Sequence, residues 1–193
     1  MIHENTFKKA FEAISEVHST DINKELHDGT HYPSELLYSQ RMYKTLIDYD
    51  PSANYAMQLA ALCQHFERWE IQRDTFPMNK KGYYDWRKAV MTYQLKRTVE
   101  VLKASGLEDV DIEEVTDILL NRGKKDHDKG QVLEDVACIV FVEWYLESFS
   151  EKHDLTKVID IVTKTVKKIS SKGMFTISEK ELPEVVGNIL KQL

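Results

Sequence analysis

Residues 131–150 read QVLEDVACIVFVEWYLESFS and form the most apolar stretch of the chain. Glu134 and Asp135 stand near its start, and only Glu143 interrupts the apolar run that follows as far as Leu146. A stretch of this length without glycine or proline predicts a helix, and a helix that is apolar nearly all round belongs in the centre of a bundle. We therefore expect a helical domain built around these residues.

The other helices are predicted from apolar residues at three- and four-residue spacing and from the caps and breakers between them. Together they give an all-α bundle of seven or eight helices, one domain spanning residues 1–193. Residues 19–33, 71–81 and 124–130 are expected to be loops. Besides 131–150, the predicted helices are a first one capped by Asn5 or Thr6, then residues 34–49, 53–70, 82–104 (stopped by Gly106) and 112–121, one capped by Asp154, and a short last one with a capping box at Ser178 and Glu181.

Composition and charge limit the classes of function. The 193 residues are 42% hydrophobic and 30% charged, as in globular proteins. The formal net charge of −6 argues against broad non-specific binding to nucleic acid or anionic membrane. There is no apolar signal segment and no run near the ~18 uncharged residues of a membrane span, which indicates a cytoplasmic protein. Cys63 and Cys138 lie in apolar runs and are expected to be buried free thiols.

Arginine is concentrated in one part of the chain. There are 20 Lys but 6 Arg, and four of the arginines fall between residues 41 and 87. If residues 53–70 are helical, His65, Arg68, Trp69 and Gln72 project toward neighbouring positions. Arginine grips phosphate or carboxylate with two parallel hydrogen bonds and stacks on aromatic rings. The pattern predicts an anion-binding pocket with an aromatic wall, formed by Arg41, Arg68, Trp69, Arg73, Tyr83, Trp86 and Arg87.

A structural explanation of the same residues stays open. The arginines could form surface ion pairs with Glu67, Glu70, Asp74 and Asp85, while Trp69 and Trp86 pack in the core.

The two acids at the start of the apolar helix form a second candidate group. The helix dipole favours acids near a helix N-terminus, which can account for Glu134. Asp135 lies next to residues that must be buried, and a buried carboxylate is costly without a partner. We expect an arginine or a metal ion as that partner.

Three blocks of the sequence resemble an uncharacterised domain-of-unknown-function family of bacteria and fungi, some members of which are labelled glutamyl-tRNA synthetase. The resemblance covers roughly residues 5–190 and brings almost no biochemistry with it. The blocks are PSELLYSQRM (residues 33–42), QHFERWEIQRDTFPMNKKGYYDWR (64–87) and LEDVACIVFVEWY (133–145).

A more distant resemblance is to the helical HD phosphohydrolase superfamily, whose members hold a divalent metal on two histidines and two aspartates. It rests on the order of a helix near Tyr38 and Ser39, the segment LAALCQH (59–65) and the segment LEDVACIVF (133–141). Tyr38 or Ser39 stands where the first metal-binding histidine of that superfamily would be.

The HD resemblance implies site residues. Asp135 matches the last metal-binding aspartate, and Gln64-His65 replaces the His-Asp pair. It therefore implies His65, Asp135 and Glu134 at a reaction centre, with His65 and Asp135 as ligands of a possible divalent metal. That metal would activate water against a phosphate ester.

Three functions follow as hypotheses. The first is a phosphohydrolase-like domain acting on a nucleotide or other small phosphorylated compound. The second is a metal-free protein that keeps the fold and pocket and binds a nucleotide, phosphate or RNA, with Lys124, Lys125 and residues 164–172 contacting RNA phosphates. The third is a structural helical protein in which the Arg/Trp cluster is an interface.

Overall fold

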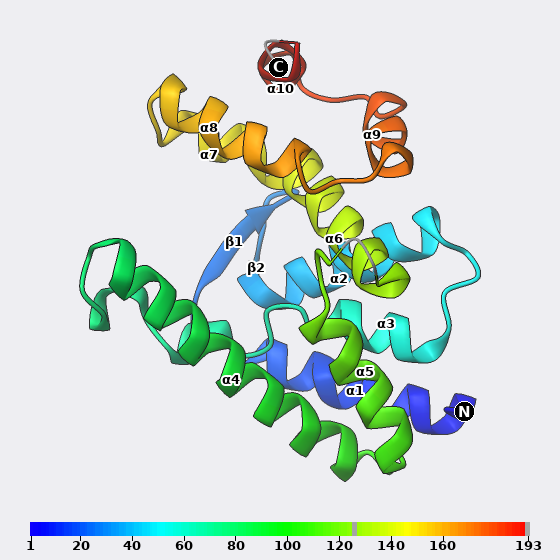
Figure 1. Cartoon of the computed structure of the whole chain (residues 1–193). Helices are drawn as coiled ribbons and strands as arrows, with labels where there is room; N and C mark the ends of the chain where they lie inside the picture. The colour runs from blue at the N-terminus through cyan, green and yellow to red at the C-terminus, as the bar shows by residue number, and fades with distance from the viewer. Residues whose placement is uncertain (125–126, 192–193) are drawn as a thin grey trace.

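The computed structural model describes residues 1–124 and 127–191. Within these residues the fold contains ten α-helices and one small two-stranded sheet, so the predicted all-α class is confirmed (Figure 1). In chain order the elements are α1 (Glu4–Ser19), β1 (Lys24–His27), β2 (Thr30–Pro33), α2 (Ser34–Tyr49), α3 (Tyr55–Leu62), the 3-10 turns η1 (Arg68–Glu70) and η2 (Arg73–Thr75), α4 (Lys80–Ala104), α5 (Asp109–Leu120), α6 (Asp128–Val140), the π-helical segment η3 (Phe141–Tyr145), α7 (Leu146–Glu151), α8 (Leu155–Val166), α9 (Ser171–Ser178) and α10 (Glu184–Leu190).

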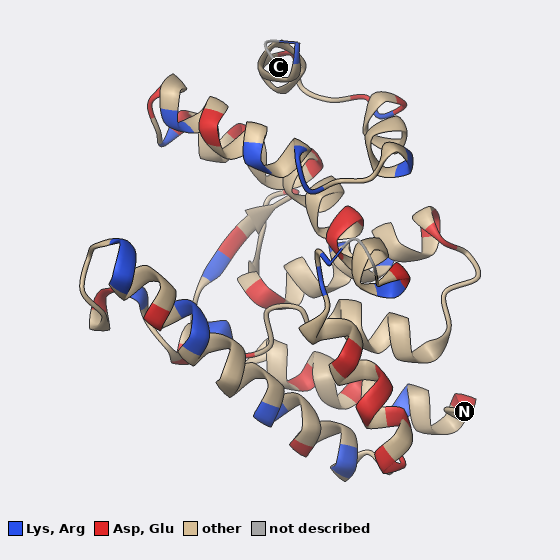
Figure 2. Ribbon diagram, viewed as in Figure 1, with Lys and Arg blue, Asp and Glu red and all other residues tan. Residues whose placement is uncertain are grey.

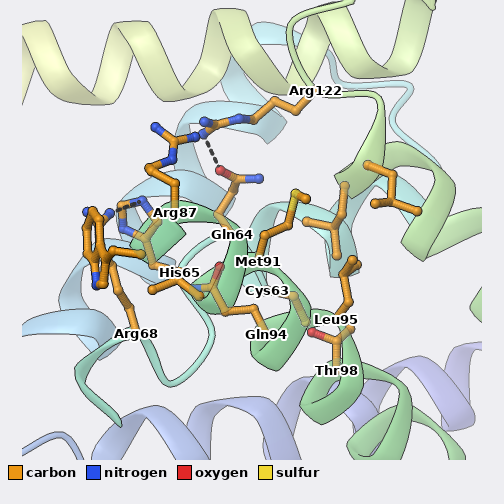
Figure 3. Close-up of a pocket in the computed structure, with 14 residues that line it drawn as sticks. Cys63, Gln64, His65, Arg68, Arg87, Met91, Gln94, Leu95, Thr98 and Arg122 are labelled. Atoms are coloured by element: carbon orange, nitrogen blue, oxygen red, sulfur yellow. Dashed lines mark hydrogen bonds between the residues drawn. The ribbon is translucent and has the colours of Figure 1, made fainter. Parts of the chain in front are cut away.

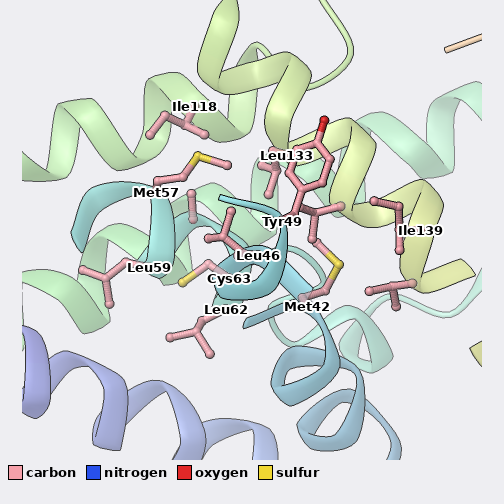
Figure 4. Close-up of a cluster of buried hydrophobic side chains, with 14 of the residues drawn as sticks. Met42, Leu46, Tyr49, Met57, Leu59, Leu62, Cys63, Ile118, Leu133 and Ile139 are labelled. Atoms are coloured by element: carbon pink, nitrogen blue, oxygen red, sulfur yellow. The ribbon is translucent and has the colours of Figure 1, made fainter. Parts of the chain in front are cut away.

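Helix α6 lies at the centre of the bundle, as its composition predicts. It packs against α2, α3, α5 and α9. Leu133, Val136, Ile139 and Val140 are completely buried. Figure 4 shows Leu133 and Ile139 meeting Met42 and other core side chains from neighbouring helices. The burial of this apolar surface is the main force holding these helices together.

The two ends of the chain lie on opposite sides of this core. Helix α1 packs on α2, α3 and α4, near the N-terminus. In Figure 1, α8, α9 and α10 lie on the far side of α6 from α1. Within this C-terminal part, α8 and α10 pack against α7, and α9 packs against α6.

Several predicted helix boundaries are confirmed. Asp154 caps α8, because its Oδ1 accepts a hydrogen bond of 3.0 Å from the backbone N–H of Lys157. Gly106 ends α4 with a φ of +87°, a conformation that costs glycine little. Helix α2 begins at Ser34 as expected.

The predicted loop 19–33 contains a β-hairpin. Strands β1 and β2 are antiparallel, and Lys24 pairs with Pro33. The turn residues Asp28 and Gly29 have φ values of +47° and +76°. An Asp-Gly pair with two positive φ angles matches the right-handed twist of a tight hairpin, and this signal was present in the sequence.

Two other predicted boundaries are wrong. The helix expected over residues 53–70 ends at Leu62, and Glu67 has a φ of +49°, which no helix accommodates. Ser178 is the last residue of α9 and not a cap, since α10 begins after Pro183. The helix expected over residues 131–150 is confirmed, since α6, η3 and α7 follow one another without a break, although its middle is the π-helical segment η3.

Two further predictions concern the cysteines and membrane-spanning helices. Cys63 and Cys138 are both buried and free, as predicted. Within the described ranges, no helix combines the length and the apolar character needed to cross a membrane.

Candidate functional site

A cavity of about 240 Å³ lies between α4, the end of α5 and the segment that follows α3 (Figure 3). We call it the arginine cavity. Its polar wall consists of Gln64, His65, Arg68, Arg87, Gln94 and Arg122, and Trp86 with several aliphatic side chains supplies the apolar wall. Three of the six arginines of the chain therefore face one space.

Each arginine reaches the cavity from a different element. Arg68 is in η1, Arg87 is near the start of α4, and Arg122 follows the end of α5. The loop between η1 and α4 is held by the Trp86 indole, whose Nε1 donates to the carbonyl oxygen of Ile71 at 2.9 Å. These contacts fix the position of Arg68 relative to Arg87.

The close approach of this loop to α4 depends on Gly82. A Cβ atom at this position would lie 2.1 Å from the carbonyl oxygen of Pro77. Arg73 also holds the loop, because its guanidinium donates to the carbonyl oxygens of Phe76 and Pro77 at 3.1 and 3.0 Å. Arg73 therefore supports the loop and does not line the cavity.

Arg68 and Arg87 differ from the other arginines in their partners. Among the residues that the structure describes, no carboxylate lies within ion-pair distance of either one, although the other arginines are engaged. Those partners are Glu25 for Arg41, the loop carbonyls for Arg73, Glu67 and Glu100 for Arg97, and Glu134 for Arg122. The predicted ion pairs of Arg68 and Arg87 with neighbouring acids are therefore not formed.

Arg122 links the cavity to the start of α6. Its Nε lies 3.1 Å from Glu134 Oε2, and its Nη1 donates to the side-chain oxygen of Gln64. Glu134 is 5% exposed and also lies 3.4 Å from Lys168 Nζ. The cation that was expected beside Asp135 is thus found beside Glu134 instead.

Among the described residues, the side chains that line the cavity include three arginines and no carboxylate, although the whole chain is acidic. Arg87 lies in the first turns of α4, where Figure 2 shows basic residues gathered; Lys80, Lys81 and Lys88 lie in the same turns but do not line the cavity. The guanidinium of Arg68 lies 5.1 Å from the centre of the Trp86 ring, a cation–π contact that holds it in place. This arrangement favours an anion.

His65 lies on the wall of the cavity between a cation and an acid. Arg68 Nη1 donates to its Nε2 at 3.0 Å, and its Nδ1 lies 3.4 Å from Glu35 Oε2. Because arginine can only donate, Nε2 is the unprotonated nitrogen and the proton sits on Nδ1, facing Glu35. The ring also stacks on Tyr38, with centroids 4.2 Å apart.

Burial sets the protonation of two titratable groups in the cavity wall, His65 and Cys63. It lowers the pKa of the His65 imidazole, and the neighbouring Glu35 partly opposes this shift. Burial raises the pKa of the Cys63 thiol to about 12. His65 is therefore neutral near pH 7, and Cys63 is a protonated thiol with little nucleophilic character.

Asp135 is buried and fully satisfied by neutral donors. Its exposed fraction is 1%. Oδ1 accepts from Gln131 Nε2 and from the Ser170 backbone N–H, both at 2.8 Å, and Oδ2 accepts from the Tyr49 hydroxyl at 2.6 Å and from the Ser170 hydroxyl. The expected arginine or metal partner is replaced by these four hydrogen bonds, which join α2, α6 and the N-terminus of α9.

The expected meeting of His65 and Asp135 is wrong. His65 stacks on Tyr38 in the second turn of α2, whereas Asp135 bonds to Tyr49 at its last residue. Eleven residues of helix separate these contacts, about 16 Å at 1.5 Å per residue. In the described part of the chain, no three His, Cys, Asp or Glu side chains are grouped so as to hold a metal ion.

Three further predicted ligand residues do not line the arginine cavity. Arg41 is 7% exposed, and its guanidinium lies over Trp144 and Tyr145 at 4.6 and 5.0 Å. Trp69 is half-buried on another side of η1. Tyr83 is 42% exposed and accepts a long hydrogen bond of 3.5 Å from Arg87. Of the predicted set, the cavity collects His65, Arg68, Trp86 and Arg87.

Three residues that line the arginine cavity or the cavity next to it, Arg122, Glu35 and Gln94, were not predicted from the sequence. A signal for Arg122 existed in the sequence, because Gly123 after it marks a tight turn shortly before the acid Glu134. Gly123 has a φ of +78°, and a Cβ there would lie 3.3 Å from Glu134 Oε2. No local signal distinguishes Glu35 or Gln94 from other polar helix residues.

The lysines expected to contact RNA are mostly engaged within the chain. Lys164 pairs with Asp160, Lys168 with Glu134, and Lys172 Nζ donates to the Tyr49 carbonyl oxygen at 3.0 Å. Lys124 donates to Asn121, and Lys125 lies outside the described residues.

Comparison with known proteins gives one match. Residues 8–190 match the model of a family described as a domain of unknown function (DUF4202). No curated protein and no solved structure matches the chain.

Proposed function

The chain belongs to the DUF4202 family, and we propose that it binds a small phosphorylated compound through the arginine cavity. One observation carries the proposal: Arg68 and Arg87, the two arginines without a carboxylate or carbonyl partner in the described chain, line the same cavity as Arg122. Unpaired guanidinium groups that converge on one space repel one another, and a dianionic phosphate would remove that repulsion. Arginine also matches the geometry of phosphate oxygens.

The cavity fits a charged head group better than a whole large ligand. Its volume of about 240 Å³ lies below the ~300–1,000 Å³ typical of sites for drug-sized molecules. The Gln94 amide nitrogen is buried there without a hydrogen-bond partner, so a further phosphate oxygen or ester oxygen could accept from it. The metal-free binding alternative is thus the function that this geometry supports best.

Ligand-induced stabilisation tests the proposal. Inorganic phosphate and a series of phosphate monoesters are added to the purified protein, and the unfolding midpoint is measured with and without Mg²⁺ or Mn²⁺. Binding to the native state raises the midpoint. At least one phosphate compound should do so without added metal, and chloride at equal ionic strength should not.

Substitutions of the cavity arginines test whether the stabilisation by phosphate compounds comes from binding in the arginine cavity. Loss of one charge-assisted bond of about 1.5–3 kcal/mol predicts a roughly ten- to hundredfold lower affinity for Arg68→Ala and for Arg87→Ala. Lys88→Ala is the matched control, because it removes an exposed cation from the same turn of α4. Wild-type affinity in both arginine variants, or no stabilisation by any phosphate compound, would overturn the proposal.

Hydrolysis of a phosphate ester is the second candidate, because His65 lies at the cavity wall with its Nδ1 3.4 Å from Glu35 Oε2. If Arg68 turned from His65 to a bound phosphate, the Nε2 lone pair would be free to accept a proton from water, as in general base catalysis. Release of inorganic phosphate from monoesters measures this activity. This phosphate release should disappear in His65→Gln, while phosphate binding is kept. If no ester is turned over by the wild type, hydrolysis is ruled out and only the binding function remains.

A further inference from the structure

We propose that a second cavity, beside the arginine cavity, is a subsite for a planar heterocycle with N–H donors, such as an amino-bearing nucleobase. This inference rests on the proposed function and narrows its ligand to a nucleotide. It assigns recognition of the base to residues of α2 and η3 and not to the tryptophans of residues 64–87.

The second cavity, which we call the ring pocket, has a volume of about 290 Å³. His65 and Arg68 line both this pocket and the arginine cavity. These two side chains therefore form the boundary between the spaces. A ligand with an anionic group and a ring can contact both sides of this boundary at once.

The walls of the ring pocket are aromatic. Phe141 and Tyr145 come from η3, and Tyr38 comes from α2. A π-helical segment inside an α-helix is rare and is frequent at functional sites, because the extra residue re-aims the side chains beside it. Here it carries two of the aromatic residues that line the pocket, which suits a flat ring.

Two oxygen atoms of the pocket, on Tyr145 and Glu35, are buried and can each accept a hydrogen bond from a ligand. Among the residues that the structure describes, none forms a hydrogen bond with the buried Tyr145 Oη. Glu35 Oε2 is also buried, and its 3.4 Å contact to His65 Nδ1 lacks hydrogen-bond geometry. Glu25, the other acid of the pocket, is already paired with Arg41. A buried acceptor left unpaired is destabilising, and native proteins rarely keep one without a reason.

These acceptors select the chemistry of the ring. A carboxylate oxygen accepts hydrogen bonds and cannot donate them, so Glu35 favours an N–H or amino group and disfavours a bare carbonyl or ring nitrogen. Adenine, guanine and cytosine each carry an amino group on a flat ring. A sugar phosphate without a base would leave Glu35 and Tyr145 as they are.

Binding of matched ligands tests the inference. Titration calorimetry with inorganic phosphate, ribose 5-phosphate, AMP, GMP and CMP compares ligands with and without a base. In the wild type, at least one nucleotide should bind ten or more times tighter than ribose 5-phosphate. Ala137→Leu, which fills the ring pocket, should reduce that ratio to near one while the affinity for inorganic phosphate stays unchanged.

Tyr145→Phe separates a binding role from a structural role. The variant should keep or raise the unfolding midpoint, because the hydroxyl it loses makes no hydrogen bond in the folded protein. The affinity ratio between the best nucleotide and ribose 5-phosphate should fall at least threefold. Tyr84→Phe, which changes an exposed tyrosine, is the control and should leave the ratio unchanged.

The outcomes distinguish the two proposals. If phosphate and ribose 5-phosphate bind but no nucleotide binds tighter, the ring pocket inference is overturned and the proposed function stands. If no phosphate compound binds, the proposed function fails. Adenosine, guanosine and cytidine then decide the ring pocket, which is supported only if one of them binds the wild type and not Ala137→Leu.

Discussion

Replacing Asp135 tests whether this buried carboxylate holds the fold together or takes part in chemistry. It accepts four hydrogen bonds from Tyr49, Gln131 and Ser170, and none of these donors is charged. Asp135→Ala removes the whole acceptor. Asp135→Asn keeps Oδ1 for the two N–H donors, and the two hydroxyl groups can rotate to accept from the new amide.

The magnitude follows from which donors water can reach. Tyr49 is 7% exposed, whereas Gln131 and Ser170 are part-exposed, so water can replace some of the lost bonds. Two bonds to a charged group at about 1.5–3 kcal/mol each, less the desolvation that the carboxylate no longer suffers, give a loss of about 3 kcal/mol for Asp135→Ala. At ~2–4 °C per kcal/mol for a chain of this size, its midpoint falls by roughly 6–12 °C. Asp135→Asn should lose about 1 kcal/mol.

Urea and thermal unfolding of the three proteins measure these differences. Asp160→Ala is the matched control, because this aspartate is exposed and its ion pair with Lys164 is worth at most about 1 kcal/mol. Phosphate affinity should be unchanged in Asp135→Asn. If Asp135→Ala is no less stable than Asp160→Ala, or if Asp135→Asn abolishes ligand binding or turnover, the structural role is refuted.

Three further predictions concern charge, pH and backbone space. Arg122→Met leaves Glu134 buried without its main cation and should cost about 3 kcal/mol in the free energy of unfolding by urea; adding Glu134→Gln should restore most of it, and additive losses would contradict the pairing. Burial lowers the pKa of His18, so the unfolded chain takes up the proton first, and stability is lost as the pH falls below about 6.5. His18→Leu should make unfolding less dependent on pH between 7.5 and 5.5, and an unchanged slope would rule this out. Gly82→Ala places a Cβ 2.1 Å from a loop carbonyl oxygen and should cost about 1–3 kcal/mol and weaken phosphate binding, whereas Gly187→Ala, with open space around it, should do neither.

Features decided by local patterns could be predicted from the sequence. The apolar run of α6, the Asp154 cap and the Gly106 stop each act over a few residues, and each lies where expected. The proximity of His65 and Arg68 was also predicted, because these residues are three positions apart. Such features depend little on what the rest of the fold does.

Features decided by distant partners could not be predicted. The residues after Leu62 have helical spacing, yet Phe66 turns completely into the core and Glu67 pairs with Arg97, thirty positions away. Tertiary contacts outweigh helix propensity here, since propensity contributes at most a few tenths of a kcal/mol per residue.

The two buried acids show the same limit. The sequence indicates that Asp135 needs a partner but not which one, and it leaves the helix dipole as a sufficient explanation of Glu134. Glu134 pairs with Arg122 in the turn after α5, whereas Asp135 bonds to Tyr49 and Ser170, 86 and 35 positions away. The metal pair of His65 and Asp135 was implied by the HD resemblance, and the structure does not bring these two residues together.

The two buried thiols can report local opening of the structure, because each is shielded by different helices. Cys63 lines the arginine cavity, and Cys138 lies under α8, with its Sγ 4.0 Å from the Thr165 carbonyl oxygen. Burial raises the pKa of each thiol to about 12, so a thiol reagent reacts only when the surrounding helices open. Labelling followed by mass spectrometry would time the opening of α4 and of α8 separately in the unmodified chain. A ligand in the arginine cavity should slow the labelling of Cys63 and leave the labelling rate of Cys138 unchanged.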